Sequence, residues 1–261
     1  MIALVIVLAI VNLLLWSEVF YKQFFKRFYD IICALLALIV FCWLYAIIAI
    51  LVKIKLGSPV LFTQIRPGKK GKYGKEKLFK LYKFRTMTDE RDGNGNLLPD
   101  DVRLTKFGAF LRSTSLDEIP EALNILKGDM SIIGPRPQLV RDMVFMDEKQ
   151  RMRHSEKPGM SGLAQVKGRN AITWEEKLNW DLKYVENVSF FCDVRIVFET
   201  VIVAFVNKKG ITDGKNVTAL DYGDALLIAG RIDKSEFDKK QASARSIVES
   251  YDKTRLEKRK S

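Results

Sequence analysis

A run of 22 residues without a charged side chain, residues 31–52, most constrains how this chain can fold. A transmembrane helix needs about 20 consecutive apolar residues, so the run is long enough to cross a bilayer. Basic residues flank it on both sides: Lys22, Lys26 and Arg27 before it, and Lys53 and Lys55 after it. The positive-inside rule therefore selects neither orientation, and one resolution is a re-entrant helix with both ends in the cytoplasm.

A second apolar segment lies at the N-terminus. Residues 2–15 are apolar except for Asn12. As a helix they would be about 21 Å long, short of the ~30 Å hydrocarbon core. The segment also lacks the basic start of a secretory signal peptide. We expect residues 1–20 to form an uncleaved hydrophobic anchor, with a lone interfacial helix as the alternative, and residues 22–55 to form the re-entrant or spanning membrane helix.

The sequence after this membrane helix has the pattern of a soluble domain. Residues 60–65 and 78–86 predict two strands. The loop between them holds three glycines and five lysines, which indicates a β-hairpin with a basic loop. Apolar residues at spacings of three and four predict helices over 102–112 and 174–185, and a further helix is expected over about 117–127.

Two further segments complete the expected organisation. Residues 194–206 are apolar apart from Arg195, Glu199 and Thr200 and are too short to span a bilayer, so they suit the membrane surface or a core. The tail from about residue 235 is rich in charged residues and is expected to be solvated helix or disorder. The predicted fold class is α+β and mostly helical, with a membrane-embedded N-terminal helix, interfacial amphipathic helices and a small antiparallel β-hairpin. The expected units after the membrane helix are a cytoplasmic domain over 56–212 and a charged tail over 213–261.

The charge balance points to an anionic partner. The chain carries 43 lysines and arginines against 31 acids, for a net charge of +12. Nucleic acid, anionic lipid and a phosphorylated substrate all fit this excess. The apolar run favours lipid, and a nucleic-acid binder is supported by net charge alone because no binding motif is identifiable. The single histidine, His154, excludes a histidine-based metal cluster, so a metal would need oxygen ligands, as Mg²⁺ does.

Two adjacent acids, Asp117 and Glu118, are the strongest candidates for chemistry. They lie where a helix is expected to start, and the free N–H groups and the dipole there favour ionised carboxylates. An ionised aspartate is a competent nucleophile and an ionised glutamate a competent ligand for a hard metal. The alternative is plain helix capping, since Ser115 and Glu118 have the spacing of a capping box.

Phosphate chemistry needs cations around the phosphoryl group, and the chain offers several. Arg136 lies in a segment stiffened by two prolines, Gly134-Pro135-Arg136-Pro137, although a surface loop would look the same. Each cation alone is more often a solvated surface charge. The candidate set is Lys83, Arg85, Arg112, Arg136 and Arg169.

A series of motifs in fixed order makes the chain resemble a known family. They include Ser115-Leu116-Asp117-Glu118 and Gly134-Pro135-Arg136-Pro137, together with residues 26–30, 62–68, 83–87, 103–108, 123–131, 157–162 and 168–172. Over about residues 22–212 the chain is similar to the bacterial sugar transferases, the monotopic polyprenol-phosphate phosphoglycosyl transferases, in their short single-domain form.

The resemblance implies an activity at the bacterial inner membrane, with the catalytic domain over 56–212 facing the cytoplasm. Asp117 would attack the sugar-linked phosphate of a UDP-sugar and expel UMP, giving a covalent aspartyl phosphosugar. Undecaprenyl phosphate would then accept the phosphosugar, in the first membrane step of glycan assembly. Glu118 would hold Mg²⁺.

The resemblance also assigns the other site residues. Lys83, Arg112 and Arg136 fall at phosphate-binding positions and Asp181 at a further active-site position, with Arg85 and Arg169 as additional substrate-binding candidates. A second copy of the chain and downstream glycosyltransferases are further candidate partners. The alternative function is a catalytically inactive, membrane-anchored partner in glycan assembly.

One departure from the family concerns the membrane helix. The family commonly breaks its re-entrant helix at a Ser-Pro pair, whereas this chain has Cys42-Trp43 there and no proline or glycine over residues 31–52. Because such residues are the usual cause of a kink, a straight span stays open for this chain.

Overall fold

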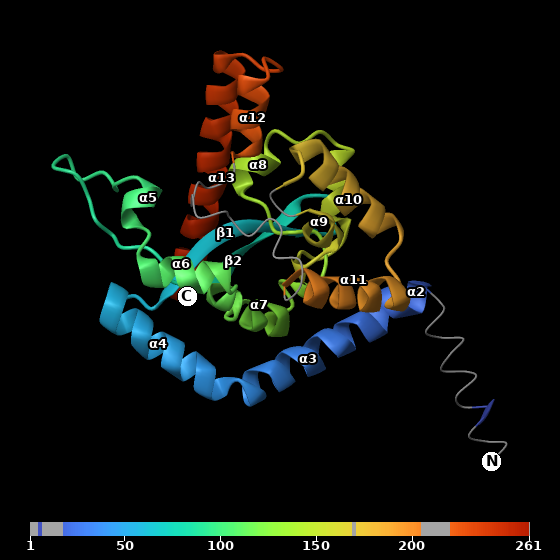
Figure 1. The fold of residues 1–261 in the computed structure, drawn as a ribbon. Coiled ribbons are helices and arrows are strands. Elements are labelled where there is room, and N and C mark those ends of the chain that lie inside the picture. The colour runs from blue at the N-terminus through green and yellow to red at the C-terminus, as the bar shows by residue number, and fades with distance from the viewer. Residues whose placement is uncertain (1–4, 7–17, 169–170, 205–219, 261) are drawn as a thin grey trace.

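The computed structural model describes residues 5–6, 18–168, 171–204 and 220–260. Over these ranges the chain is mostly helical around an antiparallel hairpin, which confirms those parts of the predicted fold class (Figure 1). A parallel pair, β3 (Ser131–Ile133) and β4 (Gly159–Ser161), was not expected, because three-residue strands are too short to show a period. Most of the predicted anchor over 1–20 lies outside the described residues.

The apolar run forms two helices that meet at Phe41. α2 (Glu18–Phe20) and the π-helical turn η1 (Tyr21–Phe25) lead into α3 (Lys26–Val40), and α4 (Cys42–Leu56) follows. The bend between Glu18–Val40 and Cys42–Leu56 is 65°. Within the described ranges no single helix is long and apolar enough to cross a membrane, whereas this bent pair has the length and composition together. The chain therefore forms a broken helix, not a straight one.

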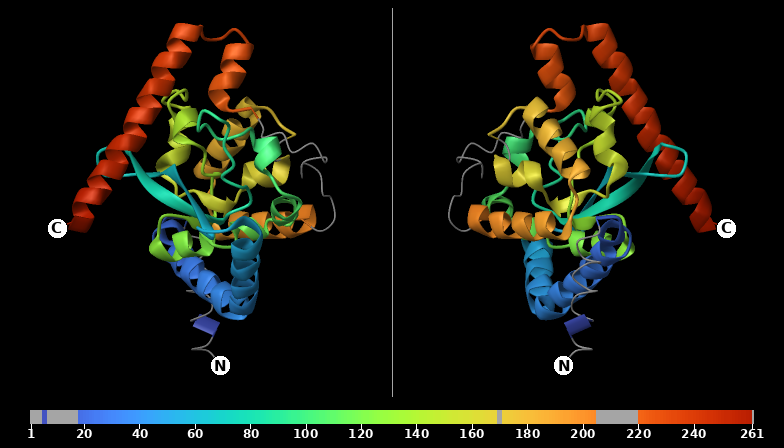
Figure 2. Two further views of the ribbon diagram at one scale, coloured as in Figure 1. Left: turned by 90° about the vertical axis from the view of Figure 1, so that its left-hand side faces the viewer. Right: turned by 90° about the vertical axis from the view of Figure 1, so that its right-hand side faces the viewer.

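The break needs neither proline nor glycine. Phe41 leaves the helical region, with φ −103° and ψ 15°, and its N–H points at the carbonyls of both Ala37 and Ile39. The chain therefore changes direction at Phe41, where α3 ends and α4 begins. The two helices form a V whose apex points away from the rest of the fold (Figure 2).

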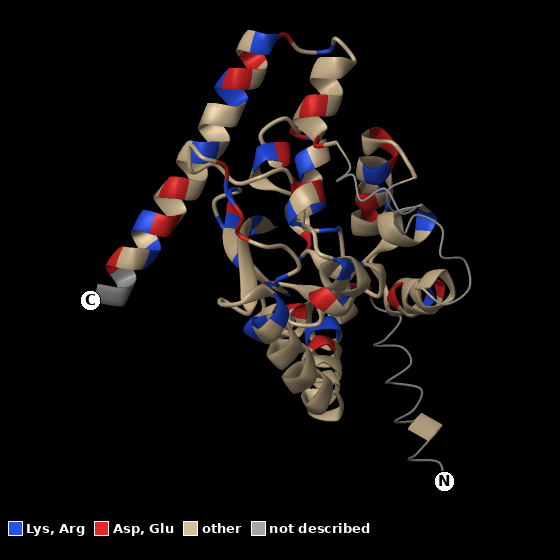
Figure 3. Cartoon of the chain, turned by 60° about the vertical axis from the view of Figure 1, so that its left-hand side comes forward, with Lys and Arg blue, Asp and Glu red and all other residues tan. Residues whose placement is uncertain are grey.

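Large apolar side chains cover the outside of this V. Ile39 is 68% exposed, Trp43 58% and Ile54 74%. Figure 3 shows no charged residue at the apex, while charges gather on the elements above it. The helix α11 (Phe190–Ile202) buries Ile196 and exposes Phe198, so its apolar residues lie both against the core and at the surface.

Polar side chains fasten the start of α3 to the domain. Lys26 donates to the Ile133 carbonyl at 2.9 Å and forms a buried ion pair with Asp193 on α11. Asp30 accepts hydrogen bonds from Ser131 Oγ at 3.0 Å and from the backbone N–H that follows at 2.9 Å. The membrane-type helix is therefore held in a fixed position relative to β3.

The hairpin forms the centre of the fold. β1 (Leu61–Lys70) pairs with β2 (Glu76–Phe84), and α7 (Glu121–Lys127) packs on β2. Buried Asn124 of α7 bonds both to the Tyr82 N–H at 3.0 Å and to the Lys80 carbonyl at 2.7 Å, which fixes the helix on the strand. A buried apolar cluster joins these elements to α3: Ala34, Phe79, Leu81, Ile125 and Met130.

The predicted helices are present with shifted bounds. The one expected over 102–112 is split into α5 (Asp100–Arg103) and α6 (Lys106–Ser113), because Thr105 caps α6 by accepting from the Gly108 N–H at 3.0 Å. The one expected over 174–185 is α10 (Trp174–Glu186). The remaining elements of this region are η2 (Leu116–Glu118), α8 (Val140–Met143), η3 (Gln150–Ser155) and α9 (Leu163–Lys167).

The C-terminal segment folds back onto the domain. α12 (Tyr222–Ile228) and α13 (Lys234–Lys260) run antiparallel from a turn at the end of the molecule farthest from the V, and α13 continues back toward the hairpin (Figures 1 and 2). Tyr222 packs with Phe145, and Ala244 of α13 is buried against Val140 and Met143. The expectation of solvated helix or disorder from about residue 235 is therefore wrong in one respect: α13 has a buried apolar face.

Candidate active site

Asp117 is a buried carboxylate in a strained turn. Its turn, η2, follows α6 through Ser115. The φ of Ser115 is 55°, in the left-handed region that residues other than glycine rarely adopt. Asp117 is 8% exposed, and burial raises its pKa to about 6 against the attraction of Lys83. The expectation that the helix start would favour the ionised form is thus wrong in direction for this carboxyl, because burial outweighs the favourable charges.

Helix capping does not account for this pair. The Ser115 side chain makes no cap hydrogen bond, and α7 begins only at Glu121, after Pro120. Asp117 and Glu118 therefore lie in a separate turn ahead of α7 and not in the first turn of a capped helix. In the turn over residues 115–118, Ser115 and Glu118 therefore do not form the capping box that the sequence suggested as an alternative.

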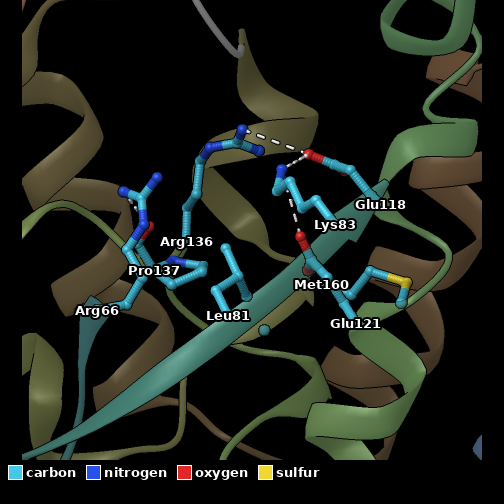
Figure 4. A pocket seen from close by; sticks show the side chains of 9 residues that line it. Arg66, Leu81, Lys83, Glu118, Glu121, Arg136, Pro137 and Met160 are labelled. Atoms are coloured by element: carbon cyan, nitrogen blue, oxygen red, sulfur yellow. Dashed lines mark hydrogen bonds and ion pairs between the residues drawn. The ribbon is translucent and has the colours of Figure 1, made fainter. Parts of the chain in front are cut away.

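Lys83 is the centre of the charged cluster. Its ammonium lies 2.6 Å from Glu118 Oε1 and 3.3 Å from Glu121 Oε1 (Figure 4). Arg136 approaches the same Glu118 oxygen at 3.6 Å. Two cations thus converge on one carboxylate oxygen beside Asp117, where a ligand with negative charge would also be attracted.

Close backbone contacts fix the loop that carries Arg136. The Gly134 N–H donates to the Ser161 carbonyl at 2.9 Å, and the Gly159 N–H donates to the Pro135 carbonyl at 3.0 Å. A Cβ added at Gly159 would lie 2.0 Å from the Gly134 nitrogen, so only glycine allows this approach.

Two guanidinium groups hold the same loop by its carbonyls. Arg153 donates to the Arg136 carbonyl at 2.6 Å, and Arg66 donates to the Pro137 carbonyl at 3.1 Å. Arg153 is itself held by Asp181, with Nε and Nη2 lying 2.9 and 2.6 Å from Asp181 Oδ2. Both side chains of this pair are 1% exposed. Asp181 is therefore linked to the Arg136 loop through Arg153, which it holds by an ion pair.

The other predicted cations differ in their surroundings. Arg112 donates from Nε to Thr86 Oγ1 at 3.0 Å, and its charge acts on Asp117 by lowering the carboxyl pKa. Arg85 is buried and donates to carbonyls at the end of α4 and in the turn after it, including that of Ser58 at 2.9 Å. Its guanidinium thus secures the link between α4 and the hairpin. Arg169 lies outside the described residues.

Sequence reasoning missed two residues of this cluster. Glu121 is 3% exposed, and burial raises its pKa to about 7 against the nearby Lys83 charge. Burial, and then the neighbouring Arg136, lowers the pKa of Arg66 to about 10. Figure 4 shows Arg66 beside Pro137 in the pocket wall. Glu121 lies about one helical turn after Asp117 in the sequence, and this spacing could have indicated that it belongs to the site. The pocket is lined by Arg66, Leu81, Lys83, Glu118, Glu121, Arg136, Pro137, Gly159 and Met160.

The carboxylates of this site suit a metal ion that is bound jointly by protein and ligand oxygens better than one bound by protein side chains alone. Among the described residues no group of three or more histidine, cysteine or acidic side chains has the geometry to hold a metal ion. Mg²⁺ commonly binds through one or two carboxylates together with water and substrate phosphates. Glu118, which is partly exposed beside the cations, provides one such carboxylate. The residues present therefore fit Mg²⁺ bound together with a diphosphate.

The chain is similar in sequence to known proteins. The bacterial sugar transferase family matches residues 21–207. The sugar transferase EpsL of Bacillus subtilis is 50% identical over 194 residues, which are 74% of this chain and 93% of that protein. A UDP-glucose:undecaprenyl-phosphate glucose-1-phosphate transferase of Klebsiella pneumoniae is 40% identical over 194 residues, 70% of this chain and 41% of that protein.

A third relative acts on a different sugar. A UDP-N-acetylgalactosamine-undecaprenyl-phosphate N-acetylgalactosaminephosphotransferase of Aeromonas hydrophila is 37% identical over 189 residues, 68% of this chain and 43% of that protein. This chain thus spans less than half the length of the Klebsiella and Aeromonas proteins. The matched range contains Asp117, Glu118 and the cations around them, and the chain belongs to the bacterial sugar transferase family.

Proposed function

We propose that this enzyme transfers a sugar 1-phosphate from a UDP-sugar to undecaprenyl phosphate, giving undecaprenyl diphosphosugar and UMP. The observation that carries the proposal is the buried Asp117 carboxylate next to Lys83 and Glu118, in a domain that also carries an exposed apolar V. The named activities of the Klebsiella and Aeromonas relatives support the same pair of substrates.

The first step is attack by an Asp117 oxygen on the phosphorus that bears the sugar. A bond from the carboxylate oxygen to phosphorus forms, the bond from phosphorus to the UMP oxygen breaks, and UMP leaves with the electron pair. Lys83, Arg112 and Arg136 stabilise the negative charge of the diphosphate as it reacts. Asp117 must be ionised to attack, so burial slows the reaction at acidic pH and costs little above neutrality.

The second step regenerates the carboxylate. A phosphate oxygen of undecaprenyl phosphate forms a bond to the phosphorus of the aspartyl phosphosugar, and the bond from phosphorus to the Asp117 oxygen breaks. Glu118 would hold Mg²⁺, which when bound supplies positive charge to the diphosphate. The Lys83 ammonium contacts both Glu118 and Glu121, and these contacts keep Glu118 in position.

Incubation with a UDP-sugar labelled in the sugar tests this function. The protein in nanodiscs should release UMP and acquire a covalent label without lipid acceptor, and undecaprenyl phosphate should then discharge the label. Asp117→Asn should acquire none, whereas Glu118→Gln should label slowly and respond weakly to Mg²⁺. A panel of UDP-sugars identifies the donor. Absence of UMP release with every donor would favour the inactive assembly partner.

We further propose that the V inserts from the cytoplasmic face of the inner membrane. Its two arms return to the same side of the domain, and α4 ends on Lys53 and Lys55 (Figure 1). Cysteines introduced at residues 22 and 53, with Cys33, Cys42 and Cys192 replaced by alanine, should react with an impermeant maleimide only from the cytoplasmic side. Reaction of either position from outside would contradict this topology.

A further inference from the structure

A second cavity lies farther along the hairpin, toward its loop, than the cluster around Lys83. Its volume is about 170 Å³, which is several times the share of liquid volume that one water occupies, about 30 Å³. Backbone glycines and lysine side chains from three parts of the fold line it, chiefly Gly68, Lys69, Lys70, Lys77, Gly128 and Lys157. The cavity therefore brings to one place basic residues that are far apart in sequence.

The positive charge of this cavity is largely unneutralised. Among the described residues, no carboxylate lies within ion-pair distance of Lys70, Lys77 or Lys157. Lys69 pairs with Glu156 at 3.2 Å. Of the described residues that line the cavity, Asp129 is the sole acid. An anion that entered would thus meet a surplus of ammonium groups.

Two cationic side chains, Arg27 and Lys157, lie close to Gly128. Gly128 ends α7 with φ +84°, and a Cβ there would lie 3.4 Å from Arg27 Nη2 and 3.6 Å from Lys157 Nζ. Arg27 is fixed in place by its bond to the Leu126 carbonyl at 2.8 Å. Burial lowers the pKa of Lys157, and the Arg27 charge lowers it further, although Asp30 opposes them. The two cations repel each other at a point where an anion would relieve the repulsion.

An apolar cluster separates this cavity from the candidate active site. Phe79 lines the second cavity and Leu81 lines the first, and both belong to the cluster that includes Met130, with Met160 packed against it. The lysines around Gly128 are therefore not part of the Lys83 cluster.

We propose that this second cavity binds a phosphate group, as a soluble anion or as the headgroup of an anionic lipid. Lysine ammonium groups bind phosphate as point charges, and glycine backbone lets the anion approach closely. Arg27, which lies beside Gly128 at the cavity, belongs to α3, the helix that continues into the apolar V, so the cavity adjoins the start of the expected membrane segment. The proposal is independent of the transfer reaction.

Calorimetric titration of the full chain in phosphatidylcholine nanodiscs with inorganic phosphate tests the site. Lys157→Gln should weaken phosphate binding about tenfold, the loss of one charge-assisted contact. Lys72→Gln, an exposed lysine of the same hairpin loop that does not line the cavity, is the matched control and should change binding less than about twofold. Lys83→Gln should leave this binding event in place, which separates it from phosphate at the active site.

A second arm identifies the source of the phosphate. If phosphatidylglycerol in the nanodiscs competes with inorganic phosphate in the unmodified chain and not in Lys157→Gln, the ligand is a lipid headgroup; if it does not compete, the ligand is soluble. Should Lys157→Gln fail to fold by circular dichroism, the double variant Lys70→Gln/Lys77→Gln replaces it, since Lys77 is exposed. Unchanged phosphate affinity in a folded variant, or no binding of either probe, overturns the proposal.

Discussion

Lys83 Nζ lies 2.6 Å from Glu118 Oε1, and this contact joins the β-hairpin to the turn that carries Asp117. The same ammonium lies 3.3 Å from Glu121. One lysine therefore neutralises two acids and leaves the third, Asp117, next to a positive charge that favours its ionised form. The arrangement makes Lys83 the residue on which the charges of the site most depend.

Lys83→Gln should lower UMP release by about 10²–10³-fold, because the variant loses a cation at the reacting phosphate and leaves the acids facing one another. The measurement is UMP release at saturating UDP-sugar. Lys80→Gln on the same strand is the matched control, since Lys80 pairs with Asp252 at the surface and such pairs contribute little. Equal loss in both variants would mean that the strand, and not the Lys83 charge, is affected.

Formation of the covalent intermediate should depend on pH through Asp117. Burial raises the pKa of this carboxyl to about 6, and only the ionised form attacks. The labelling rate in single turnover should therefore fall about tenfold for each pH unit below about 6 and level off above about 7. A rate that is constant between pH 5 and pH 8 would exclude Asp117 as the group that titrates.

Glu121→Gln should stabilise the protein at alkaline pH and not at acidic pH. The folded protein raises the pKa of Glu121 from 4.5 to about 7, chiefly by burial, so the folded state binds this proton more tightly than the unfolded state does. The free energy of unfolding therefore decreases as pH rises through this window, and the full cost is present above about 7. Glutamine keeps the shape without the charge.

Thermal unfolding at pH 4.5 and pH 8 measures this effect. Each kcal/mol should appear as about 2–4 °C in Tm for a domain of this size. Glu249→Gln, an exposed residue of α13, should leave Tm unchanged at both pH values. A gain in Glu121→Gln that is equal at the two pH values would contradict the raised pKa.

Much of the fold follows from sequence patterns, and the misses have physical causes. Alternation and spacing predict the hairpin and α10, because each element repeats its period over many residues. The parallel pair of β3 and β4 has three residues per strand, and the break at Phe41 arises from backbone conformation and not from a proline. Neither leaves a signal in composition or period.

The candidate site was predictable to the extent that its residues carry charge and lie in motifs. Lys83, Glu118 and Arg136 do come together. The sequence could not tell that Asp181 faces Arg153 and that Arg85 faces backbone carbonyls, since both depend on packing between distant segments. Burial likewise reversed the expected pKa shift of Asp117, because a motif says nothing about desolvation.

The variants Asp181→Asn and Arg136→Gln should distinguish a residue that positions the Arg136 loop from one that supplies charge to the substrate. Asp181 and Arg153 form a fully buried ion pair, and removing one partner of such a pair typically costs about 3–5 kcal/mol. Asp181→Asn should therefore lower stability strongly and activity indirectly, through the Arg136 carbonyl that Arg153 holds. The Arg136 side chain is 48% exposed, so Arg136→Gln should lower UMP release without changing urea unfolding. Normal stability in Asp181→Asn would contradict the positioning role.

Phe41→Asp should weaken retention of the chain in the membrane. Phe41 lies at the junction of α3 and α4, where neighbouring large side chains are exposed and uncharged, and it is 45% exposed itself. An aspartate in the middle of a membrane helix costs about 2.5–3.5 kcal/mol on insertion scales, and the apex of a re-entrant V is its deepest point. The measurement is the fraction that sediments with membranes after a carbonate wash. Tyr73→Asp, at an 88% exposed position in the hairpin loop, adds the same charge away from the V and should sediment as the unmodified chain does. Full retention of Phe41→Asp would mean that the apex does not enter the hydrocarbon core.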